Sequence, residues 1–138
     1  MDALARLGFS AHFRDAVRAH ALRDGAPARV ARIERRQVLA LGLDRPDEGL
    51  DGEPRWVPVL SSLTFLGGRD VPKLAVGDWI WVRAGRHPAV ERVLPRATCL
   101  VRKRAHRRTE PQPIAANVDV VFVVTTGGRD LNLARLER

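Results

Sequence analysis

The segment at residues 76–83, VGDWIWVR, constrains the fold more than any other part of this 138-residue chain. Bulky side chains alternate along it with the two-residue period of a β-strand, not the 3.6-residue period of a helix. One face of the strand would carry Trp79, Trp81 and Arg83, and the other would carry Ile80 and Val82. A domain built mainly from β-strands is therefore predicted.

Four more short apolar segments, separated by turn residues, accompany this strand. Residues 27–43 predict a β-hairpin that turns at residues 34–36. Residues 55–63 predict a strand that Pro58 confines to an edge or an end, and residues 89–94 predict a fifth strand. Five short antiparallel strands in so small a domain favour a closed barrel of the OB-fold type over a sandwich.

The two ends of the chain follow other patterns. Residues 2–24 predict a helical segment with Ser10 as an N-cap. Residues 118–124 form an almost continuous apolar run, as in a strand buried on both faces of a parallel sheet, and residues 130–138 then predict a helix. Such a pair begins an α/β domain, so we expect a chain truncated soon after a second domain starts. The alternative is an extra strand and helix packed on the barrel.

The charge of the chain is unevenly placed. Lysine and arginine number 24 against 16 acidic residues, for a net charge of +8, and 22 of these cations are arginine. A coding bias explains the high arginine content as well as a function does. The positions of the cations along the chain are therefore more informative than their number. Residues 92–108 hold seven cations and no acid, whereas residues 44–53 are acidic and predict a solvated loop. No segment resembles a membrane span or a secretory signal, so we expect a cytoplasmic protein without a membrane partner.

The basic region predicts contact with RNA phosphates, because clustered cations release counterions from a nucleic acid. The alternative is a solvated linker at residues 96–113. Residues near the turn after the central strand also suit phosphate contact, and four arginines of the first hairpin would extend the surface. The candidate RNA-binding residues are Arg83, Arg86, His87, Arg96, Arg102, Lys103, Arg104, His106, Arg107 and Arg108. Trp79 and Trp81 are either core residues or stacking platforms for bases, with the core favoured.

Four stretches, taken together, carry a family resemblance: GDWIWVR at 77–83, VERVLPRATCLVRK at 90–103, RRTEPQPIAANVDVVFVVTT at 107–126 and DLNLARLER at 130–138. They resemble the N-terminal part of the ribosome small-subunit-dependent GTPases. The resemblance implies a helical segment at 1–26, an OB-fold barrel at 27–95, a basic linker at 96–113 and, at 114–138, the start of a circularly permuted GTPase domain. It further implies action late in small-subunit maturation, with the barrel against ribosomal RNA.

The chain lacks the residues that GTP chemistry needs. It contains neither a GxxxxGK[ST] phosphate loop nor an NKxD base-recognition motif, so we do not expect this chain alone to be an enzyme. GTP, magnesium and zinc are implied only for a full-length family member, and His87, Cys99 and His106 do not form a zinc set. No cofactor and no catalytic residue is expected here. The alternative function is an autonomous interaction or regulatory domain that associates through the strand at 118–124. Asn117, at the entrance to that strand, is expected to cap backbone groups and not to catalyse.

Overall fold

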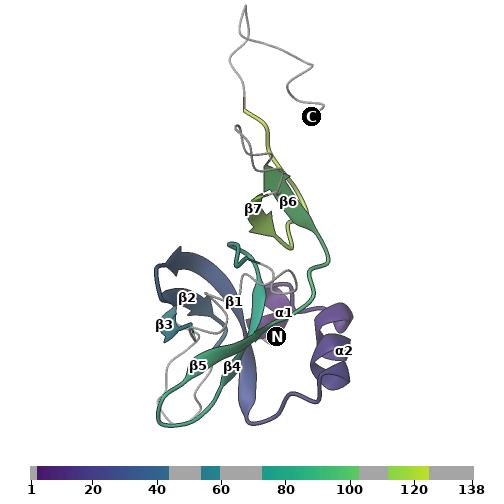
Figure 1. The fold of residues 1–138 in the computed structure, drawn as a ribbon. Coiled ribbons are helices and arrows are strands. Elements are labelled where there is room, and N and C mark those ends of the chain that lie inside the picture. Colours follow the sequence, from purple (N-terminus) through teal and green to yellow (C-terminus); the bar gives the residue numbers. More distant parts are fainter. Residues whose placement is uncertain (1–2, 44–53, 60–72, 103–111, 125–138) are drawn as a thin grey trace, which may run out of the picture.

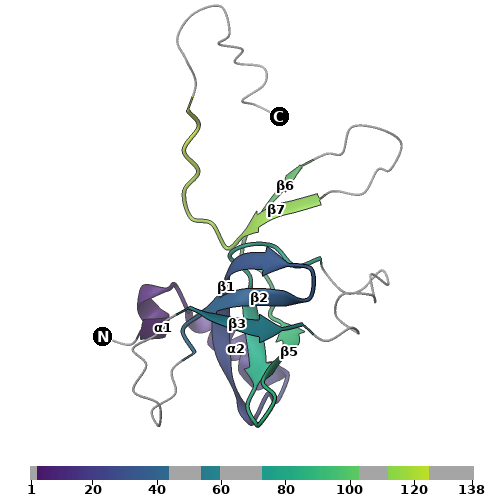
Figure 2. The ribbon, with the colours of Figure 1, turned by 90° about the vertical axis from the view of Figure 1, so that its left-hand side faces the viewer.

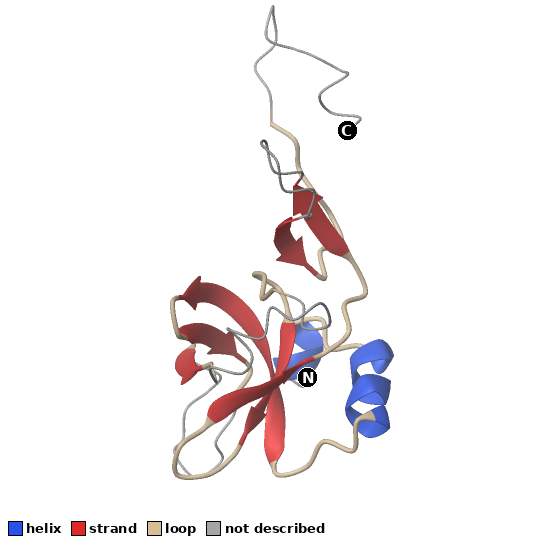
Figure 3. Ribbon diagram, in the orientation of Figure 1, coloured by secondary structure: helices blue, strands red, loops and turns tan. Residues whose placement is uncertain are grey.

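The computed structural model describes residues 3–43, 54–59, 73–102 and 112–124 (Figure 1). Two helices come first, α1 (Ala3–Arg6) and α2 (Ala11–Ala19). A five-stranded sheet contains β1 (Gly25–Glu34), β2 (Gln37–Leu41), β3 (Arg55–Pro58), β4 (Trp79–Arg83) and β5 (Ala89–Val93). A smaller sheet contains β6 (Cys99–Arg102) and β7 (Gln112–Ala116). The described chain is mainly β, as predicted (Figure 3).

The larger sheet is antiparallel throughout and has the order β3-β2-β1-β4-β5. The predicted hairpin is confirmed, because Glu34 of β1 pairs with Gln37 of β2 across a two-residue turn. The strand containing Pro58 is also confirmed as an edge strand, and Pro58 is its last residue. Proline suits that place because it cannot donate a ladder hydrogen bond.

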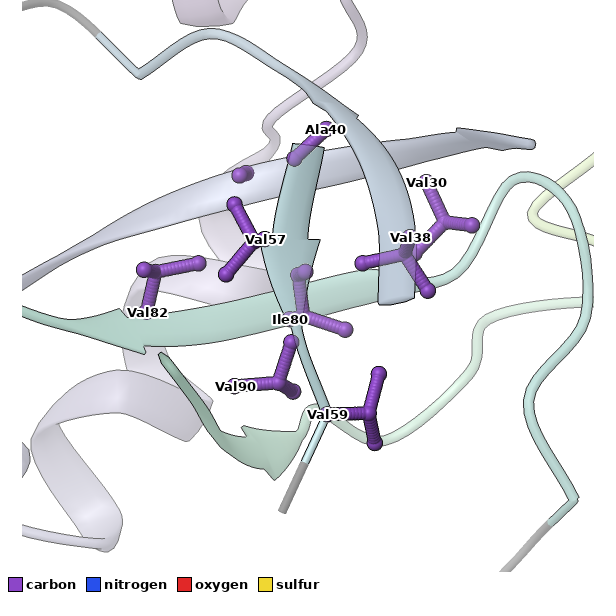
Figure 4. Close-up of a cluster of buried hydrophobic side chains, with 9 residues drawn as sticks. Val30, Val38, Ala40, Val57, Val59, Ile80, Val82 and Val90 are labelled. Carbon is purple, nitrogen blue, oxygen red and sulfur yellow. The ribbon is translucent and has the colours of Figure 1, made fainter. Parts of the chain in front are cut away.

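The sheet curls into an OB-like barrel that is not fully closed. Within the described residues, its two edges are joined by an isolated parallel bridge between Val59, directly after β3, and Val90 of β5. Bulges in β1 and in the β4–β5 pairing assist the curvature. Small aliphatic side chains fill the interior (Figure 4), and these are Ala28, Val30, Val38, Ala40, Val57, Val59, Ile80, Val82 and Val90.

A second, aromatic cluster joins the N-terminal helices to the barrel. Phe9 and Phe13 pack with Trp79 and Leu94 on the side of β4 opposite the aliphatic core. The predicted single helical segment is instead two short helices, because the chain turns at Gly8 with a φ of +88°. Ser10 occupies the predicted N-cap position of α2, although its side chain makes no capping hydrogen bond.

The predicted linker at residues 96–113 is wrong in part, because β6 and β7 pair there as an antiparallel hairpin. Figure 2 shows this hairpin extending from one end of the barrel. All four residues of β6 are exposed, so the strand carries no hydrophobic alternation by which it could have been predicted. Backbone pairing, not burial, defines it.

The prediction of a doubly buried strand at residues 118–124 is also wrong for this structure. These residues form no strand, and Phe122 and Val124 are 88% and 94% exposed. A strand of this composition needs neighbouring strands on both edges, and no described strand pairs with these residues. The predictions for residues 44–53 and 130–138 lie outside the described residues. Among the described helices, none has the length and apolar character required to cross a membrane.

Candidate nucleic-acid interface

Three of the predicted RNA-binding residues lie together at the C-terminal end of β4. Arg83 is the last residue of the strand, and Arg86 and His87 lie in the turn to β5. The turn begins where the amide of Ala84 donates to the carbonyl of Asp24 at 2.7 Å. Gly85, with a φ of +131°, then reverses the chain. All three predicted side chains are exposed, so this end of the barrel presents positive charge to solvent.

A pocket of about 360 Å³ opens at the same end of the barrel. Val57 and Val82 of the barrel interior form part of its wall, and Arg55, Trp56 and Arg83 also line it. This volume is at the lower end of the range typical of small-molecule sites. The pocket therefore places an apolar surface beside cationic side chains, which is the combination that a nucleotide's base and phosphate require.

Trp56 is a site residue that the sequence analysis missed. It lies on β3 next to Val57, and strand alternation sends Val57 into the core and Trp56 outward. The Trp56 side chain remains 42% exposed, and the guanidinium carbon of Arg32 lies 5.8 Å from its ring centroid. Strand alternation in the sequence could have placed Trp56 and Val57 on opposite faces of the strand, but it could not have shown which face is covered.

The two tryptophans that the sequence offered as stacking platforms are core residues. Trp79 is fully buried and Trp81 is 6% exposed. The ring centroids of Trp79 and Phe9 lie 4.8 Å apart in an edge arrangement. Neither indole is therefore available to a base, and the favoured core interpretation is confirmed.

Arg96, another of the predicted RNA-binding residues, makes its contacts within the fold. Its Nε and Nη2 donate to the two carboxylate oxygens of Asp78 at 2.7 and 2.8 Å, and Nη2 also donates to the carbonyl of Lys73 at 2.6 Å. The Asp78 side chain is fully buried, and that of Arg96 is only 14% exposed. Hydrogen bonding to Asp78 raises the pKa of Arg96 above its ordinary value. The guanidinium is thus fully engaged inside the fold.

Arg102 is exposed at the end of β6, on the hairpin. The other five residues of the predicted cluster lie outside the described residues, and these are Lys103, Arg104, His106, Arg107 and Arg108. The structure therefore places Arg102 on a hairpin apart from Arg83, on a different sheet.

Asn117 joins the hairpin to the barrel. Its side-chain amide donates to the carbonyl of Gly77 at 3.0 Å, and its Oδ1 accepts from the amide of Ala97 at 2.8 Å. The Asn117 carbonyl accepts from Nη2 of Arg29 at 2.8 Å. The residue adopts the left-handed conformation with a φ of +54°, which asparagine tolerates well. The predicted backbone-capping role of Asn117 is confirmed.

The described residues offer exposed features that a ligand could contact and contain no cluster of metal ligands. No group of three or more His, Cys, Asp or Glu side chains in the part of the chain that the structure describes could hold a metal ion. The exposed features are cations, one aromatic side chain and an apolar pocket. Features of these kinds suit contact with phosphates and bases.

Comparison with known proteins finds relatives over almost the whole chain. A protein named "Small ribosomal subunit biogenesis GTPase RsgA" from Streptomyces coelicolor is 33% identical over 142 residues, which covers 99% of this chain and 35% of the relative. Proteins of the same name from Mesorhizobium japonicum and Syntrophotalea carbinolica are 35% and 30% identical, each over 98% of this chain. They are covered over 34% and 37% of their own lengths, so the chain spans about a third of these relatives. No family model matches the chain.

Proposed function

Because the chain belongs to the RsgA family, whose N-terminal region it matches over almost its whole length, we propose that it is the RNA-contacting part of a GTPase that acts in late maturation of the small ribosomal subunit. Its partners are the small subunit and the ribosomal RNA within it. It works in the cytoplasm, where ribosomal subunits are assembled.

The observation that carries this proposal is the 99% coverage of the chain by a relative named for small-subunit biogenesis. The exposed cations add physical support. Arg83, Arg86 and Arg102 all face solvent, and the sequence from 103 to 108 adds four more cations. Arginine suits RNA because its planar guanidinium bonds phosphate in a bidentate manner.

Hydrolysis of GTP belongs, in this proposal, to parts of the longer protein that this chain does not match. The sequence holds no GxxxxGK[ST] loop to wrap a triphosphate and no NKxD motif to recognise guanine. These residues do not fit GTP, its magnesium ion or a structural zinc, so the chain contributes binding alone. Its role is to position the longer protein on the subunit.

Cosedimentation with purified ribosomal subunits tests the proposal. The 138-residue chain should pellet with small subunits in preference to large ones, and its affinity should fall steeply as salt rises, because phosphate contacts release counterions. Equal binding to both subunits, or no binding at micromolar protein, would contradict it. Binding that does not respond to salt would also contradict it.

The exposed apolar segment at residues 118–124 favours a second candidate function, association with another protein strand. Phe122 and Val124 are almost fully exposed. Contiguous exposed apolar side chains are unusual on monomeric proteins and mark interaction sites. Replacement of Phe122 and Val124 by serine should convert any self-associated chain to a monomer in analytical ultracentrifugation. A wild-type chain that is already monomeric at high concentration would exclude self-association.

A further inference from the structure

We propose that Trp56 is a stacking platform for an unpaired RNA base, with Arg32 beside it. This inference deepens the proposed function and rests on it, because it names the form of RNA that the barrel recognises. The phosphate contacts described above are indifferent to base pairing. A stacking tryptophan would make the barrel selective for single-stranded or extruded nucleotides.

The exposure of Trp56 distinguishes it from most other described aromatic side chains. Phe9, Phe13, Trp79 and Trp81 are all less than 9% exposed, whereas Trp56 is 42% exposed. It lies on the edge strand β3, and its neighbour Val57 points from the opposite face of that strand into the core. The indole is therefore not needed to fill the barrel interior.

Side-chain contacts on the same face position a cation beside the indole. Gln37 donates to one carboxylate oxygen of Glu34 at 3.2 Å, and the other carboxylate oxygen lies 3.2 Å from Nη2 of Arg32. Arg32 in turn lies within cation–π range of Trp56, at 5.8 Å. Leu39 separates Arg32 from Trp56 in the strand register, so the three form one row across β1, β2 and β3. This row offers a base an aromatic surface and its phosphate a guanidinium.

The pocket at the end of the barrel adjoins Trp56 and does not include Arg32 in its lining. Trp56 lines the pocket together with Arg55 and Arg83. A nucleotide stacked on the indole would thus have cationic side chains on both sides along its backbone. Among the described residues, the acid beside this row is Glu34, and its carboxylate is engaged by Arg32 and Gln37. The cations favour an anionic occupant over an apolar peptide, and the exposed indole favours RNA over an acidic peptide because RNA brings bases that stack on it.

An unpaired base is the required partner because the geometry of a duplex hides the base faces. In A-form RNA each base is stacked between its neighbours, and only its edges reach the grooves. An indole can stack only on a base that has left that arrangement. The proposal therefore predicts preference for a single strand over a duplex of the same length.

The test uses the 138-residue chain and an oligoadenylate of about ten nucleotides, alone and paired with oligouridylate. Fluorescence anisotropy of the labelled RNA should show that Trp56→Ala weakens binding to the single strand by roughly tenfold and leaves duplex binding unchanged. Trp56→Phe should retain most of the affinity, since it keeps a ring. The matched control is Val76→Ala, a similarly exposed apolar side chain at 44%, which should bind as the wild type does.

A second measurement needs no destabilising variant. Trp79 and Trp81 are buried, so only the emission of Trp56 should be quenched directly by a stacked base. The single strand should quench the wild-type chain but not Trp56→Phe. Unchanged affinity in Trp56→Ala together with absent quenching would overturn the stacking inference while leaving the phosphate-based function intact. Failure of the wild type to bind both RNA and small subunits would overturn the two together.

Discussion

β4 is only five residues long, yet the polar side chains at its two ends have opposite surroundings. At the N-terminal end, Asp78 is buried and holds Arg96, and Asn117 bonds the adjacent Gly77. At the C-terminal end, Arg83 and the turn that follows are exposed beside a pocket. The difference shows that arginines close together in this fold can have different roles, depending on what their side chains contact. Arg96, which meets a buried carboxylate, is held inside the fold, whereas Arg83 and Arg86 are exposed at the other end of the strand.

The glycines near these ends give the sharpest test of that contrast. Gly77 has a φ of +88°, and an added Cβ would lie 2.1 Å from the carbonyl oxygen of Ala116. Gly77→Ala should therefore lower the free energy of unfolding by about 3 to 4 kcal/mol, because backbone strain and a backbone clash add together. Gly85→Ala meets no atom within 4 Å and should cost only about 1 kcal/mol for its positive φ. Urea denaturation of both variants measures the difference, and equal losses would contradict it.

Removal of the buried carboxylate should have the next largest effect. Asp78→Asn leaves the guanidinium of Arg96 without its anion, so the free energy of unfolding should fall by about 3 kcal/mol. Arg86→Gln is the matched change at the other end of the strand, and it should alter stability by less than about 0.5 kcal/mol. Thermal unfolding of the two variants checks this. A loss below about 1 kcal/mol in Asp78→Asn would show that the buried pair is not structural.

Asn117→Ala should have a smaller effect, confined to the junction of the hairpin and the barrel. The variant loses the hydrogen bonds to Gly77 and Ala97 and keeps an unfavourable positive φ. A loss of about 2 kcal/mol is expected. Asn117→Gly is the control, since it relieves the φ cost while still losing both bonds, and it should be less destabilised. Hydrogen exchange at the Ala116 amide, which donates to the carbonyl of Val76, should quicken in both.

Much of the barrel could be predicted from the sequence, because its strands bury one face or both. The alternation at 79–83 and the hairpin at 27–43 carry that burial in their residue types. The roles of the three tryptophans could not be predicted with the same ease. Trp79 is buried because Phe9 and Phe13 pack on it, and Trp56 is exposed because no element in the described part of the chain covers its face of β3. Such coverage is a tertiary property.

The candidate site was predicted in part, for a related reason. Exposed cations such as Arg83 and Arg86 were correctly placed in solvent near a turn. Arg96 looked equivalent to them in sequence, but Asp78, eighteen positions earlier, meets it across the fold. Strand β6 was missed because none of its side chains is buried, and residues 118–124 were assigned to a buried strand that needs partners which the described residues do not supply. Strand pairing and the partner of a charged side chain both depend on residues that are distant in sequence, so local composition does not predict them.

The central claim is that the exposed end of β4 contacts ribosomal RNA through its arginines. The most direct measurement is the slope of log affinity for purified small subunits against log salt concentration, compared between the wild type and Arg83→Gln with Arg86→Gln. We expect the double variant to fold normally and its slope to be shallower by roughly 1.4 to 1.8, since each lost phosphate contact removes about 0.7 to 0.9. An identical slope and affinity in the folded double variant would contradict the claim.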